Sequence, residues 1–128
     1  MVRRITFACA AALVLALSGW AQVFAHASLT SCTIKNNDIF PLAHAPRTVI
    51  ATFAEPLDPK QSWINVFEGV ADHGLVNEKT RSIVNFKNPK QMTLRLPALH
   101  RERYYLVWYT HSAADGHFAA GIVYFRVT

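Results

Sequence analysis

Three residues of the chain could together bind a metal ion: His26, Asp115 and His117. Asp115 and His117 lie two positions apart in the segment HSAADGHFAAG, residues 111–121. Side chains at positions i and i+2 of an extended chain point the same way, so a carboxylate and an imidazole can converge there. Gly116 lets the backbone bend between them. The same D-G-H sequence also fits a simple hairpin turn with a solvated histidine, so this segment alone leaves both interpretations open.

The role of His26 depends on a proteolytic cut. Arg3 and Arg4 lie near the start of the chain and are followed by an apolar run and by the small residues Val23 and Ala25, which is the pattern of a secretory signal peptide. The apolar run is short for a membrane span, which needs about 20 residues. We therefore expect residues 1–25 to be a signal peptide and residues 26–128 to form one exported domain.

Cleavage after Ala25 would make His26 the first residue of the mature chain. Its α-amine and its ring Nδ1 could then hold one metal ion in a six-membered chelate ring, and His117 and Asp115 would complete a set of three nitrogens and one oxygen. Such a set suits Cu(II), which prefers a tetragonal array of nitrogen and oxygen ligands. A cut after Ala27 would also leave small residues, Ala25 and Ala27, at the third-last and last positions before the cut, and it would remove His26 with its chelate. We favour the first cut because it lies closer to the apolar run.

Charge and cysteine content exclude other classes of protein. Loss of Arg3 and Arg4 lowers the 13 lysines and arginines to 11, against 8 acidic residues, so the mature net charge is about +3. No basic cluster stands out, which argues against nucleic-acid binding. Cys32 is the one cysteine left after cleavage, so an internal disulfide is excluded, and we expect it to be a buried small residue near the first strand.

The chain after residue 26 is predicted to be all β. Apolar and polar residues alternate in RTVIATFA, residues 47–54, which places Val49, Ala51 and Phe53 on one side. After residue 26, the 3.6-residue period of a helix never persists for three turns. The predicted strands cover residues 47–54, 63–68, 81–86, 92–96, 103–111 and 120–127. Short strands at this spacing predict an antiparallel sandwich or barrel, with Trp63, Trp108 and the phenylalanines supplying most of the core.

Five segments in order resemble the CopC family of bacterial copper-resistance proteins: HASL, ATFAEPLDP, LRLPAL, YYLVWYTHSAADGHFAAG and YFRV. The resemblance implies a seven-stranded Greek-key β-barrel or sandwich of the cupredoxin or Ig-like kind. It also implies a periplasmic copper carrier linked to a CopD-type inner-membrane partner, with His26, Asp115 and His117 as Cu(II) ligands. The chain departs from the family pattern because two alanines, rather than one residue, separate Ser112 from Asp115.

The resemblance and the residues together predict a monomeric periplasmic protein, without catalytic activity, that buffers or delivers Cu(II). Cu(I) prefers soft thioether ligands, and the one methionine after the cut, Met92, is expected to point inward. Two alternatives are a copper enzyme in which His26 and His117 form a histidine brace, and a metal-free sandwich that binds a partner.

The other histidines and one acid are expected to lie outside this set of three ligands. His111 could support the site or act as a fourth ligand, although a half-buried sheet histidine is the favoured interpretation. His44, His73 and His100 are expected in solvated loops and turns. Glu55 is expected to be structural, because it lies beside a proline turn.

Overall fold

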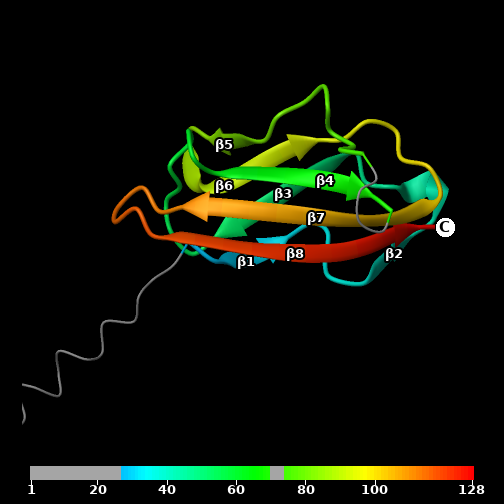
Figure 1. The fold of residues 1–128 in the computed structure, drawn as a ribbon, viewed down its shortest axis with the longest axis horizontal. Coiled ribbons are helices and arrows are strands. Elements are labelled where there is room, and N and C mark those ends of the chain that lie inside the picture. The colour runs from blue at the N-terminus through cyan, green and yellow to red at the C-terminus, as the bar shows by residue number, and fades with distance from the viewer. Residues whose placement is uncertain (1–26, 70–73) are drawn as a thin grey trace, which may run out of the picture.

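The computed structural model describes residues 27–69 and 74–128, which form two β-sheets packed face to face (Figure 1). The strands are β1 (Leu29–Cys32), β2 (Asp38–Phe40), β3 (Thr48–Phe53), β4 (Trp63–Glu68), β5 (Ile83–Asn85), β6 (Asn88–Arg95), β7 (Glu102–His111) and β8 (Phe118–Val127). A single 3-10 turn, η1 (Leu42–His44), follows β2. Within the described ranges, no helix is long and apolar enough to cross a membrane.

One sheet has the strand order β1-β3-β6-β5, and the other has the order β2-β8-β7-β4. Neighbouring strands are antiparallel except that β2 runs parallel to β8. The predicted all-β sandwich is therefore confirmed. The prediction of purely antiparallel strands is wrong at β2, and the described part of the chain has eight strands where the resemblance implied seven.

The core lies between the two sheets and is filled by alternate residues of each strand, because successive side chains of a strand point to opposite faces. The alternation predicted for β3, β6 and β8 is confirmed. The inward residues, all buried, are Val49, Ala51, Phe53, Met92, Leu94, Leu96, Val123, Phe125 and Val127. Trp108 of β7 is also buried, with its ring 5.5 Å from that of Phe53.

The prediction that Trp63 belongs to the core is wrong. Its side chain is 39% exposed on the outer face of the second sheet, where its ring stacks 5.5 Å from that of Tyr109. The inward residues of β4 are Ile64 and Val66, both fully buried. Asn65 lies on the same face of the strand as Trp63, so the period of two places the tryptophan with a polar residue on the outside.

Strands β7 and β8 span the length of the sandwich, and the loop that joins them lies at one end (orange, at the left of Figure 1). The end of β4, the start of β7 and the C-terminus lie at the other end (Figure 1). Ten residues of β7 correspond to about 30 Å at the usual rise per residue. Residues at the two ends of this strand are therefore far apart in space.

Candidate metal centre

The loop between β7 and β8 carries the D-G-H segment and is closed by backbone hydrogen bonds. The N–H of Ser112 donates to the carbonyl of His117 at 2.8 Å, and the N–H of Gly116 donates to the carbonyl of Ser112 at 3.0 Å. Gly116 has a φ of 73°, a left-handed conformation that glycine adopts without strain. The loop is thus a tight turn that holds the residues on either side of Gly116 close to each other.

Asp115 and His117 contact each other directly. Asp115 Oδ2 lies 2.9 Å from His117 Nδ1, and Asp115 Oδ1 accepts a hydrogen bond of 3.0 Å from the backbone N–H of His117. Their side chains are 41% and 48% exposed, respectively. A carboxylate that bonds an imidazole fixes the orientation of the ring, so the loop presents an oriented imidazole and an oriented carboxylate at the surface.

The same contacts explain the acidity of Asp115. The pKa of its carboxyl group falls from an ordinary value of 3.8 to about 2, chiefly because the side chain of His117 bonds the carboxylate. The backbone N–H of His117 and the hydroxyl of Ser112 lower this pKa further. Hydrogen bonds to the ionised form favour ionisation, so Asp115 is an anionic oxygen donor at every physiological pH.

Glu55 is a residue whose place beside the loop could not be read from the sequence. Its carboxylate accepts a hydrogen bond of 2.5 Å from the hydroxyl of Ser112, and that hydroxyl accepts one of 3.3 Å from the N–H of Ala114. The N–H of Ala113 also donates to the carbonyl of Pro56. The turn after β3 therefore holds the start of the D-G-H loop, including the two alanines that depart from the family pattern.

His26, the third predicted ligand, lies outside the described residues. Its neighbour Ala27 is described and is fully buried. The hydroxyl of Thr110 donates a hydrogen bond of 2.6 Å to the carbonyl of Ala27. Thr110 is the penultimate residue of β7 and pairs with Ala119 of β8. The chain immediately after residue 26 is therefore fixed at the base of the D-G-H hairpin.

His111 lies on the outer face of the sheet as a half-buried residue, as favoured from the sequence. Its Nε2 lies 3.0 Å from the hydroxyl of Tyr109, and its ring packs against those of Tyr109 and Phe118. His44 is exposed in η1 and His100 is exposed before β7, both as predicted. His73 lies outside the described residues.

Two further predictions concern sulfur. Met92 is fully buried in the core, as its alternation predicted. Cys32 is a free thiol at the end of β1 and is half-buried, and burial raises its pKa. Neither side chain therefore presents a reactive sulfur at the D-G-H loop.

A hollow in the surface lies away from the D-G-H loop. It has a volume of about 730 Å³ and lies over the outer face of the β2-β8-β7-β4 sheet, between the side chains of Tyr105, Tyr124 and Arg126. Among the described residues of its lining, Asp38 alone carries a carboxylate and none is a histidine. These described residues do not bring a carboxylate and an imidazole together as the loop does.

The fold is shared with known copper-resistance proteins. CopC from Methylosinus trichosporium OB3b matches with a TM-score of 0.68 at 24% identity, over 80% of this chain and 93% of that one. PcoC, a methionine-rich copper resistance protein from Escherichia coli, matches with a TM-score of 0.65 at 23% identity, over 81% of this chain and 100% of that one. No curated protein sequence matches the chain. The sequence model of the CopC domain matches residues 29–128, the whole sandwich together with its D-G-H loop, and on this evidence the chain belongs to the CopC family.

Proposed function

We propose that the protein is a periplasmic, non-catalytic copper carrier that binds Cu(II) through His26, Asp115 and His117. The observation that carries this proposal is the direct contact of Asp115 with His117 at the end of the sandwich to which Ala27 is bonded. Family membership and the copper-resistance proteins of the same fold support copper as the cargo.

The position of Ala27 supports the inclusion of His26. Ala27, which follows His26 in the sequence, is bonded through its carbonyl to Thr110, where the D-G-H hairpin begins. Removal of residues 1–25 would free an α-amine at that point. The amine and the imidazole of one residue would then meet the imidazole and the carboxylate of the loop.

The donor set explains the preference for Cu(II). Three nitrogens and a carboxylate oxygen suit a tetragonal divalent ion, and Cu(II) binds such ligands more tightly than the other divalent ions of the first transition row. The low pKa of Asp115 keeps a negative charge at the site, and this charge opposes reduction of the ion to Cu(I). These properties suit a protein that buffers copper or delivers it to a CopD-type membrane partner, and they do not suit a redox enzyme.

The proposal is tested by Cu(II) titration of the exported protein in competition with a chelator of known affinity. Asp115→Asn and His117→Gln should each weaken binding by at least about tenfold, which corresponds to about 1.4 kcal/mol. His44→Gln alters an exposed histidine of η1 and should leave the affinity unchanged. Wild-type affinity in the His117→Gln variant would refute the site, and absence of stoichiometric copper uptake by the wild type would favour a metal-free interaction module.

A further inference from the structure

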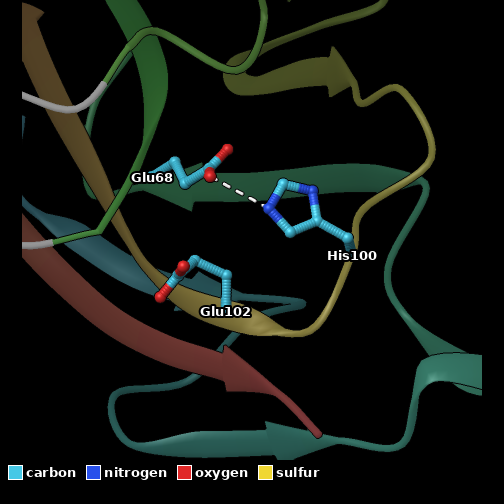
Figure 2. A group of neighbouring side chains, drawn as sticks. All are labelled: Glu68, His100 and Glu102. Atoms are coloured by element: carbon cyan, nitrogen blue, oxygen red, sulfur yellow. Dashed lines mark hydrogen bonds and ion pairs between the residues drawn. The ribbon is translucent and has the colours of Figure 1, made fainter.

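A second group of metal-binding side chains lies at the opposite end of the sandwich from the D-G-H loop. Figure 2 shows Glu68, His100 and Glu102 around one point on the surface. His100 Nε2 lies 2.9 Å from Glu68 Oε1. One donor atom from each of the three residues lies within 4.8 Å of the other two.

The strand pairing brings these residues together and holds them. Glu68 is the last residue of β4 and pairs with Tyr104, and Glu102 is the first residue of β7. The buried hydroxyl of Tyr104 donates to the carbonyl of His100 at 2.8 Å and accepts from the N–H of His100 at 3.1 Å. Glu102 Oε1 accepts a hydrogen bond of 2.8 Å from the N–H of Arg103. The backbone of the histidine and the carboxylate of Glu102 are therefore both restrained.

One carboxylate oxygen of Glu68 and one of Glu102 lie within 4.8 Å of each other. The pKa of Tyr104 is raised, first by burial and then by the negative charges of Glu68 and Glu102. Two carboxylates that share a space repel each other, and a cation between them removes that cost. A depression of about 330 Å³ is lined in part by Glu68, His100 and Tyr104 but not by Glu102, and it leaves the first two side chains open to water.

We propose that Glu68, His100 and Glu102 form a second metal site, which binds a divalent transition-metal ion of the Zn(II) class. Zn(II) binds imidazole nitrogen and carboxylate oxygen at about 2.0–2.2 Å, so two of its ligands in a tetrahedral site lie about 3.3 Å apart. The 2.9 Å between the nitrogen of His100 and the oxygen of Glu68 needs an adjustment of only a few tenths of an ångström. The ion takes the place of the proton in this hydrogen bond, and the proton passes to solvent.

The ligand types determine which ions compete for this site. Imidazole favours Zn(II) and its transition-metal neighbours over Ca²⁺ and Mg²⁺, which prefer oxygen ligands alone. Cu(II) would also bind, since it forms stronger complexes with the same ligands. The exposed fractions of the His100 and Glu68 side chains, 62% and 36%, leave coordination positions open to water and predict a modest affinity.

The test is a calorimetric Zn(II) titration of the full protein with Asp115→Asn and His117→Gln, substitutions that remove the loop ligands at the other end. This protein should bind one Zn(II) ion at the second site. His100→Gln, and separately Glu68→Gln, should weaken that binding at least tenfold, whereas His44→Gln should not. Two-dimensional NMR of the histidine rings should show that Zn(II) shifts the resonances of His100.

Two results would overturn the second site: unchanged Zn(II) affinity in the His100→Gln variant, or Zn(II) binding that leaves the ring of His100 unshifted. Near-UV circular dichroism establishes that each variant is folded before titration. Because the loop ligands are already absent, the outcome does not depend on the proposed Cu(II) site. Failure of Cu(II) binding at the loop together with retained Zn(II) binding here would refute only the copper proposal.

Discussion

At the scale of single residues, the contact between Asp115 and His117 keeps the carboxyl group of Asp115 ionised and fixes the orientation of the imidazole of His117. The carboxylate accepts hydrogen bonds from both the side chain and the backbone of His117. Both side chains remain substantially exposed, so the pair is accessible to an ion from solvent. The contact therefore orients a carboxylate and an imidazole, the two loop ligands of the copper proposal, without burying either of them.

The pKa of Asp115 tests this account of the pair. Its folded value of about 2 is below its ordinary value of 3.8, so the group stabilises the fold above pH 3.8, and this contribution is lost as the pH falls through 2. Replacement of His117 by Ala should raise the pKa toward 3.8 without restoring it fully, since the backbone N–H of residue 117 remains. Carbon-13 NMR of the Asp115 carboxyl group measures both values, and an unchanged pKa would contradict the assigned cause.

At the scale of secondary-structure elements, the hydrogen bond from Thr110 to Ala27 joins the start of the described chain to β7. The carbonyl and the hydroxyl are both in buried residues, and the bond spans 83 positions of sequence. It fixes where the N-terminal segment enters the sandwich. The copper proposal needs this tether, because the α-amine must lie next to the loop.

Thr110→Val removes the hydroxyl and leaves the carbonyl of Ala27 without this donor. We expect the free energy of unfolding to fall by about 1–3 kcal/mol, and Cu(II) affinity to fall as well. Thr110→Ser keeps the hydroxyl and serves as the control. Urea unfolding and copper competition measure the two effects, and wild-type copper affinity in Thr110→Val would show that the tether does not position the site.

The packing of β7 on β8 depends on a glycine. A Cβ atom added at Gly121 would lie 2.5 Å from Cζ2 of Trp108, whose ring also packs on Phe53 in the core. The β8 strand can accommodate this indole only where no side chain stands opposite it, which accounts for a glycine inside a strand.

Gly121→Ala should destabilise the fold by about 1–3 kcal/mol, because overpacking forces the indole or the strand to move. Gly74→Ala is the matched control, since a Cβ atom at Gly74 would meet nothing within 4 Å. Thermal unfolding followed by tryptophan fluorescence compares the two variants. Equal melting temperatures for Gly121→Ala and wild type would contradict the contact.

At the scale of the whole molecule, the β-sandwich separates the two proposed metal sites by the length of β7. The two sites share no residue, and each is fixed by its own local hydrogen bonds. Substitutions more than about 10 Å apart usually act independently. Loss of the D-G-H ligands should therefore leave the Glu68, His100 and Glu102 cluster unchanged, as the Zn(II) titration requires.

Copper binding should weaken as the pH falls. The imidazoles of His26 and His117 and the free α-amine must each lose a proton to bind Cu(II). The reference pKa values are about 6.5 for histidine and about 7.7–8.0 for the amine, so protons compete with copper already at neutral pH. Copper competition at pH 5.5 and pH 7.5 should show an affinity at least tenfold lower at the acid value. An affinity independent of pH over this range would exclude the amine and the imidazoles as ligands.

The sequence predicted what depends on local pattern. The alternation of β3, β6 and β8 identified their inward faces. The D-G-H spacing left a contact of Asp115 with His117 open, and the structure makes that contact through a tight turn at Gly116 rather than an extended segment. Strands β1 and β2 are absent from the predicted strands because both are short and each is stabilised by a distant partner, β3 for β1 and the end of β8 for β2. The hydrogen bond of Glu55 to Ser112 spans 57 positions, and that of His100 to Glu68 spans 32. Only the topology brings such residues together, so no local spacing could reveal them.

The central claim is that cleavage before His26 creates an amine ligand beside the D-G-H loop. The most direct measurement compares the Cu(II) affinity of the chain that begins at His26 with that of the same chain acetylated at the α-amine of His26. Acetylation retains every side chain and converts the amine of His26 to an amide without adding a new amine, so we predict a loss of affinity by orders of magnitude. Equal affinity in the two chains would contradict the claim.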